Sequence, residues 1–163
     1  MVYCQPKPDE TVLKEIGNSK KVFLMGCSLC ANISYCVHNK LQSPIFYKFE
    51  GPNNVKNESK RMKKILEAKG VMTGTDTMMS LCFVTSKQVR QVAQKTKEYD
   101  TVVTFSCDVG RQNLQDILED KHVAGAMKTR GLMRAVVDQH GLTFHFIKDK
   151  LYINKKKYAG SEK

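Results

Sequence analysis

The chain has 163 residues and a formal net charge of +11, and 41% of its residues are hydrophobic and 26% charged. This composition is typical of a globular protein and excludes a disordered chain. The length suits one domain that buries roughly 70% of the surface of its unfolded chain. No apolar stretch approaches the ~20 residues of a membrane-spanning helix, and no signal peptide is visible. We therefore expect a cytoplasmic protein without a membrane span.

The excess positive charge gathers in two places. Residues 56–69 contain Lys60, Arg61, Lys63 and Lys64, and residues 148–163 contain six lysines against two acidic residues. Such charge can attract nucleic acid, a membrane surface or an acidic protein, whereas a solvated helix face and a basic tail are the simpler interpretation. No aromatic residues are spaced through the first of these stretches, so it lacks the stacking surface of a single-strand binder. A nucleic-acid partner is therefore not expected.

Strand-like and helix-like segments alternate along the chain. Short apolar, β-branched or aromatic runs predict strands, and apolar residues at helical spacing predict helices. The expected strands are residues 20–26, 45–49, 71–77, 101–105 and 122–126. The expected helices are residues 32–41, 55–69, 85–99, 112–118 and 130–140. Residues 142–146 and 151–154 are expected to form a terminal hairpin.

This alternation predicts an α/β fold, Rossmann-like or flavodoxin-like. Helices of about 10–15 residues between strands favour a mostly parallel sheet flanked by helices, with right-handed connections. A C-terminal β-hairpin follows the sheet. Residues 1–147 are expected to form one α/β domain, and residues 148–163 a basic hairpin and tail.

The cysteines fall where such a fold places its chemistry. A disulfide framework is typical of small secreted proteins, so six cysteines in this chain need another explanation. Cys27, Cys82 and Cys107 each follow an expected strand, and the carboxyl ends of parallel strands meet at one edge of the sheet. Cys30 completes a Cys-x-x-Cys pair with Cys27, a spacing that lets two sulfurs reach one metal. A metal site at this edge is therefore predicted.

Four thiolates can hold either zinc or a 4Fe–4S cluster. One close pair with two distant single cysteines suits a cluster better than zinc, which usually takes two close pairs. If the chain is helical from Cys30 onward, Ser34 stays on the face of Cys30, and Cys36 is rotated away by about 120°. Cys4 is expected in a mobile N-terminus outside the site, and His38 on a helix surface. The candidate metal ligands are Cys27, Cys30, Cys82 and Cys107, with Cys36 as a possible fifth.

The nine residues Val-Phe-Leu-Met-Gly-Cys-Ser-Leu-Cys at 22–30 resemble the opening of the MetV family. This family is a zinc-binding or iron–sulfur domain similar to the C-terminal part of methylenetetrahydrofolate reductases. Its members have a strand before Gly-Cys-x-x-Cys, then a cysteine before a helix, resembled here by Cys82. A Cys-x-x-Gly turn after a strand follows, resembled by Cys107 and Gly110. The resemblance covers residues 12–146. The chain departs from the family in two ways: it has Ser34 where the family usually has a cysteine, and it lacks the cysteine-rich C-terminal segment that many members have.

The resemblance implies a metal-bearing accessory or electron-transfer subunit. It would carry a 4Fe–4S cluster, or zinc. It would work in one-carbon metabolism, as a hetero-oligomer with a flavin-dependent, methylenetetrahydrofolate reductase-like subunit. The complex would lie in the cytoplasm of an anaerobe. Another redox or methyl-transfer complex could take the place of the reductase. The alternative from the residues is a zinc-bearing thiol redox or methyl-transfer enzyme that uses Cys27 or Cys30. A third is a basic nucleic-acid module with a structural zinc.

Overall fold

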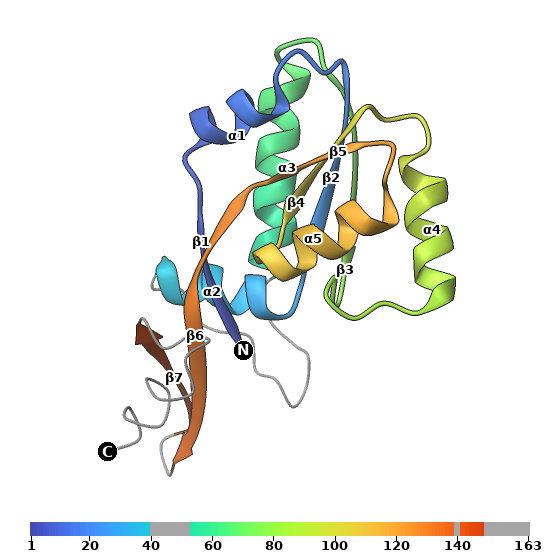
Figure 1. Ribbon diagram of the computed structural model, residues 1–163. Helices are drawn as coiled ribbons and strands as arrows, with labels where there is room; N and C mark the ends of the chain where they lie inside the picture. The colour runs from blue at the N-terminus through green and yellow to red at the C-terminus, as the bar shows by residue number, and fades with distance from the viewer. Residues whose placement is uncertain (40–52, 139–140, 149–163) are drawn as a thin grey trace.

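A computed structural model describes residues 1–39, 53–138 and 141–148. Its main sheet has four parallel strands in the order β3–β2–β4–β5 (Figure 1). The two central strands pair in parallel from Val22 opposite Thr101 to Gly26 opposite Phe105. The α/β fold expected from the sequence is therefore confirmed. The strands of this sheet are β2 (Lys21–Cys27), β3 (Met72–Met78), β4 (Thr101–Phe105) and β5 (His122–Gly125).

Helices cover both faces of the parallel sheet. Figure 1 places α3 on one side of the sheet and α4 on the other. Helix α3 packs on β2 and β3, and α5 packs on β5. No helix in the described ranges combines the length and apolar character needed to cross a membrane. The helices are α1 (Asp9–Ile16), α2 (Cys30–His38), α3 (Asn54–Glu67), α4 (Ser86–Thr96) and α5 (Asp108–Ile117).

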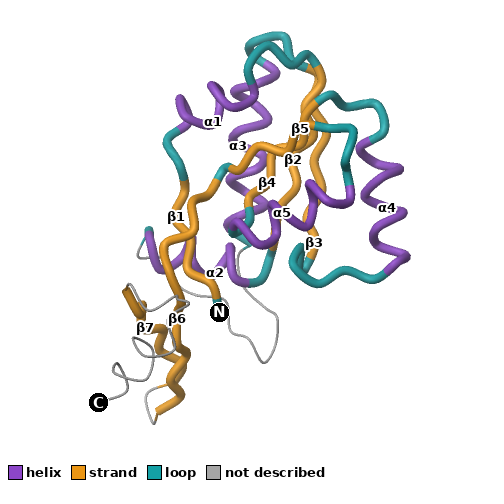
Figure 2. The backbone as a smooth tube through the Cα atoms, viewed as in Figure 1, coloured by secondary structure: helices purple, strands orange, loops and turns teal. Residues whose placement is uncertain are grey.

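A second, antiparallel sheet lies beside the first. It consists of β1 (Val2–Pro6), β6 (Met127–Asp138) and β7 (Gly141–Lys148) in the order β1–β6–β7. Figure 2 shows β1 and β6 running side by side, and α2 packs against β1. A C-terminal hairpin is present, but its pairing differs from the expected one: β7, which covers the expected arm at 142–146, pairs with β6, most of which was expected to be helical. The other expected arm, at 151–154, and the expected strand at 45–49 lie outside the described residues.

Two predictions about the chain were wrong. The helix expected at 130–140 is replaced over residues 130–138 by β6, which is hydrogen-bonded to β1 on one side and to β7 on the other. The leucine, methionine, arginine and alanine of this segment permit a helix, and pairing with distant strands overrides that weak local preference. The N-terminus is not mobile, because β1 pairs with β6 and Cys4 is completely buried.

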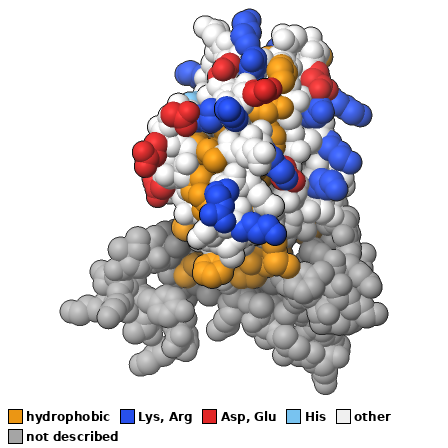
Figure 3. Space-filling view, turned by 90° about the vertical axis from the view of Figure 1, so that its right-hand side faces the viewer, with side chains coloured by type: hydrophobic (Ala, Val, Ile, Leu, Met, Phe, Trp, Pro, Cys, Tyr) orange, Lys and Arg blue, Asp and Glu red, His pale blue; other side chains and the backbone are white. Residues whose placement is uncertain are grey.

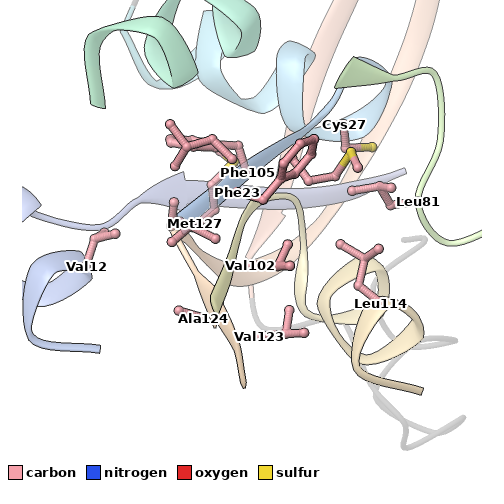
Figure 4. Close-up of a cluster of buried hydrophobic side chains, with 14 of the residues drawn as sticks. Val12, Phe23, Cys27, Leu81, Val102, Phe105, Leu114, Val123, Ala124 and Met127 are labelled. Atoms are coloured by element: carbon pink, nitrogen blue, oxygen red, sulfur yellow. The ribbon is translucent and has the colours of Figure 1, made fainter. Parts of the chain in front are cut away.

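The core of the fold is built on the two central strands. Four consecutive residues of β2, from Val22 to Met25, are at most 5% exposed, and all five residues of β4 are buried. Strands covered on both faces need such continuous apolar runs. Each fully buried apolar side chain of this size stabilises the fold by about 1.5–3 kcal/mol. Figure 4 shows Cys27 and Leu81 at one end of this buried cluster, so the core extends to the edge of the sheet where the cysteines lie.

Candidate metal centre

The candidate centre lies at the carboxyl ends of β2 and β4. From β2 the chain continues to β3 on one side of the sheet, and from β4 it continues to β5 on the other side. Such a point of divergence is where open α/β sheets bind their ligands. Cys27 is the last residue of β2, and Cys107 stands two residues beyond the end of β4. The prediction that these cysteines emerge at one edge from adjacent, buried, parallel strands is confirmed.

Cys27 is 5% exposed and surrounded by backbone polar groups. Its thiol donates a long hydrogen bond, 3.8 Å, to the carbonyl oxygen of Met79. Burial raises the pKa of Cys27, while the backbone N–H groups of Leu29 and Leu81 act in the opposite direction. These two N–H groups belong to different loops, and both favour the thiolate form of Cys27.

Cys107 occupies the N-cap position of α5. Burial raises its pKa as well, and the backbone N–H groups of Gly110 and Val109 at the start of the helix oppose that effect. A Cβ atom added to Gly110 would lie 3.0 Å from the Ser106 side chain and 3.1 Å from Cβ of Leu81. The absence of a side chain at Gly110 therefore lets the loop of Leu81 and Cys82 press closely against the turn of Cys107.

Cys30 and Cys82 are the more accessible thiols of the group. Cys30 is partly exposed at the first position of α2, and Cys82 is exposed, with its sulfur 3.3 Å from the hydroxyl oxygen of Ser80. Charge on Cys30 and on Cys82 contributes to the raised pKa of Cys107. Cys30 also contributes to the raised pKa of Cys27. The other three cysteines predicted from the sequence, Cys27, Cys30 and Cys82, thus lie within electrostatic range of Cys107.

Cys36, the fifth predicted ligand, is separate from this group. The segment from Cys30 to His38 is helical, so Cys36 is rotated away from Cys30 as the spacing predicts. Its buried sulfur accepts a hydrogen bond of 3.2 Å from Nδ2 of Asn54. Burial raises the pKa of Cys36, and no other cysteine contributes to that shift. His38 lies exposed at the end of α2, as expected.

As the side chains stand, no three His, Cys, Asp or Glu residues of the described ranges are close enough together to hold a metal ion. The chemistry of the donors nevertheless suits a soft metal or an iron–sulfur cluster. Soft thiolates select zinc and iron–sulfur clusters, and N–H groups that point to the sulfurs stabilise bound thiolates and tune clusters. Binding would require the thiol groups to move closer together.

Sequence reasoning missed one cysteine near the centre. Cys4 in β1 is completely buried, and charges on Cys107, Cys27 and Cys30 contribute to its raised pKa, for which burial is the main cause. No spacing or motif could have linked Cys4 to this edge, because the link depends on the pairing of β1 with β6.

The predicted basic face on α3 is partly neutralised. Arg61 forms ion pairs of 2.6 Å with both Asp9 and Glu58 and thereby ties α3 to α1. Lys63 lies 3.5 Å from Glu67. Exposed pairs of this kind are worth about 0–1 kcal/mol each. The lysine run at 155–157 lies outside the described residues, so the described basic face amounts to less unpaired charge than the sequence suggests.

Comparison with known proteins assigns no family to the chain. No family model, no curated protein and no solved structure gives a significant match. Membership in the MetV family therefore stays a prediction from the motifs of the sequence.

Proposed function

We propose that this protein is a metal-bearing, non-catalytic accessory or electron-transfer subunit of a one-carbon redox complex. The centre is a 4Fe–4S cluster held at the carboxyl ends of the parallel strands, where the sequence predicts Cys27, Cys30, Cys82 and Cys107 as ligands. The observation that carries this proposal is the gathering of thiols from three separate loops at the point where the connections of the sheet diverge.

The surroundings of the thiols favour a bound centre over a catalytic thiol. A reactive cysteine needs a pKa below its ordinary value, because the thiolate is the nucleophile. Burial instead raises the pKa of both Cys27 and Cys107. A metal ligand must also lose its proton, but the positive charge of the bound metal then stabilises the thiolate inside the protein, which no charge does for a free catalytic thiol. When bound, a cluster would supply one-electron transfer.

Apolar side chains beside the centre suit contact with a partner subunit. Phe83 is 80% exposed, and Met79 and Val109 are each 55% exposed. Cys82 and Val109 line one shallow depression. Figure 3 shows apolar side chains gathered at the lower end of one face, the end to which the parallel strands lead. Exposed apolar groups of this size mark interaction surfaces, and we assign this one to a flavin-dependent, methylenetetrahydrofolate reductase-like subunit in a cytoplasmic hetero-oligomer.

A second candidate is a zinc-bearing thiol redox or methyl-transfer enzyme that uses Cys27 or Cys30. The partial exposure of Cys30 favours it, because a thiol that reacts with a substrate must be accessible.

The visible absorption spectrum of anaerobically purified protein separates these functions. We expect broad absorbance near ~400 nm that dithionite bleaches, with iron and sulfide in equal amounts. The Cys27→Ser variant should lose both, whereas Cys36→Ser, also a change at a buried cysteine, should keep both. A colourless protein with one zinc would support the second candidate. A protein with neither iron nor zinc, even after anaerobic reconstitution, would overturn the proposal of a metal centre.

A further inference from the structure

The two outermost strands of the parallel sheet, β5 and β3, form lateral edges that are covered differently. At the β5 edge, the backbone N–H of Val123 donates to Oε1 of Gln115 at 3.2 Å. The backbone N–H of Gly125 donates to Oε2 of Glu15, also at 3.2 Å. Residues 123–125 are buried. Side chains of α5 and α1 therefore close this edge.

The β3 edge has backbone groups that point away from the sheet. Alternate residues of a strand turn their backbone N–H and C=O groups to opposite sides. On the side of β2, the N–H of Met72 donates to the Lys20 carbonyl at 2.8 Å. The Met78 carbonyl accepts from the N–H of Ser28 on the same side, again at 2.8 Å. The backbone groups of residues 73, 75 and 77 therefore face outward.

Most of these outward groups are free. Within residues 1–39, 53–138 and 141–148, nothing is hydrogen-bonded to the backbone N–H or C=O of Thr73 or Thr75. The N–H of Thr77 donates to Oδ1 of Asp76 at 2.8 Å. No residue of β3 is buried, and Thr75 is exposed. A row of free donors and acceptors on an accessible edge strand is a template for pairing with another strand.

The sequence of β3 is nearly the same when read in either direction. Met-Thr-Gly-Thr-Asp-Thr-Met is symmetric about Thr75, except that glycine stands on one side and aspartate on the other. A two-fold contact brings residue i of one copy to residue j of its mate, and j to i. If two β3 strands pair antiparallel about Thr75, the opposed residues are Thr75 and Thr75, Thr73 and Thr77, Gly74 and Asp76, and Met72 and Met78.

This register suits both the free backbone groups and the charges. The three threonines that face outward oppose one another, so they become the hydrogen-bonded pairs of an antiparallel ladder. Opposed threonines are also favourable cross-strand neighbours. Asp76 is the one charged residue of the strand sequence. It lies opposite glycine, not opposite a like charge, and is already paired with Lys95 of α4.

We propose that two copies of this chain form a dimer through β3, so that the two parallel sheets join into one continuous sheet across a two-fold axis. The occupant of the open edge is thus the β3 strand of a second copy. This inference goes beyond the proposed function and does not depend on a bound metal. The dimer leaves the exposed Phe83 surface available to the partner subunit.

Charge variants at Thr75 test the symmetry of the contact. In Thr75→Lys and in Thr75→Glu, like charges oppose each other across the two-fold axis and disfavour pairing. Sedimentation velocity over a range of concentrations measures the mass. We expect a dimeric wild type and, for each variant alone, dimerisation that is at least about tenfold weaker. An equimolar mixture of the two variants should dimerise again, because lysine then opposes glutamate.

Backbone variants test the hydrogen bonds. Thr75→Pro removes an outward N–H and spares the bonds to β2, since an edge strand tolerates proline where the N–H faces solvent. We expect this variant to be a monomer with an unchanged circular dichroism spectrum. Thr75→Val, the matched control, keeps the N–H and a β-branched side chain and should stay a dimer. Phe83→Ser, on the surface assigned to the partner subunit, should also stay a dimer.

Three results would overturn the inference. They are a wild type that is monomeric throughout the micromolar range, a mixture of Thr75→Lys and Thr75→Glu that stays monomeric, and a dimer that Phe83→Ser dissociates while Thr75→Pro does not. If Thr75→Pro does not fold, the mixture decides, because its recovery requires two folded variants. The proposed function is judged separately, by iron, sulfide and zinc content, so either proposal can fail without the other.

Discussion

Thr129 caps a helix of the neighbouring sheet, and its removal should have a measurable cost. Helix α5 begins after Cys107, whose side chain makes no capping hydrogen bond. The hydroxyl of Thr129 in β6 accepts the N–H of Asp108 at 2.9 Å instead. Thr129→Val removes this acceptor and keeps a β-branched side chain, which a strand favours. The lost cap should lower the free energy of unfolding by about 1 kcal/mol, within the range of about 0.5–2 kcal/mol measured for such caps.

Urea unfolding followed by far-ultraviolet circular dichroism tests this expectation. With a denaturant slope of about 1–3 kcal/mol/M, a loss of 1 kcal/mol lowers the midpoint by roughly 0.3–1 M. Thr75→Val is the matched control, because Thr75 is an exposed strand threonine whose hydroxyl makes no hydrogen bond within the described part of the chain. If Thr129→Val and Thr75→Val unfold at the same urea concentration, α5 is not capped from the second sheet.

Three other properties follow from particular contacts. The Arg61 guanidinium lowers the pKa of Asp9. The stabilisation by this pair is therefore present above the ordinary pKa of an aspartate and is lost as the pH falls through the lowered value. Unfolding measured at decreasing pH should show a loss of about 1 kcal/mol or less in the wild type and none in Asp9→Asn. Gly74→Ala would place a Cβ against the Tyr99 ring and 2.7 Å from Phe23. It should lower the free energy of unfolding in urea by about 1–3 kcal/mol, and by less in a Tyr99→Phe background, which lacks the hydroxyl. An equal loss in both backgrounds would contradict the contact. In the metal-free protein Cys82 is the exposed cysteine, so an alkylating reagent should label it first, as mass spectrometry of digested samples would show. Earlier labelling of any buried cysteine would contradict the placement of its loop.

The parallel sheet could be predicted because its central strands are buried on both faces. Such strands need nearly continuous apolar residues. Residues 22–25 are all apolar, and residues 102–105 are apolar except for the β-branched Thr104. The positions of Cys27 and Cys107 then follow from the rule that the carboxyl ends of parallel strands meet at one edge. This part of the site depends on local sequence and on a general property of the fold, so no alignment or structure was needed to expect it.

The second sheet could not be predicted because its strands depend on partners far away in the sequence. Residues 2–6 are too few to give a periodic signal, and they form a strand through pairing with residues 127–132. Residues 130–138 contain helix-permissive side chains, and long-range pairing decides their conformation. For the same reason Cys4 could not be connected with the other cysteines. The short helix α1 did carry local signals, since Asp9 and Glu10 at its start suit the helix dipole.

The second sheet therefore has a role in the site that its position at the end of the fold does not suggest. Hydrogen bonds join it to the segments that follow the parallel strands: Cys4 N–H donates to Ser34, the Ser34 hydroxyl donates to the Val2 carbonyl, and Asp108 N–H donates to Thr129. Ala126, the residue before β6, donates to the Thr104 carbonyl at 2.9 Å. The bonds of Ser34 lie on the helix of Cys30, and the bond of Asp108 lies in the turn of Cys107. Because both segments are attached to the same pair of strands, β1 and β6 set the distance between them. The proposed centre would therefore depend on both sheets: the parallel sheet brings the cysteines to one edge, and the antiparallel sheet is hydrogen-bonded to two of the segments that carry them.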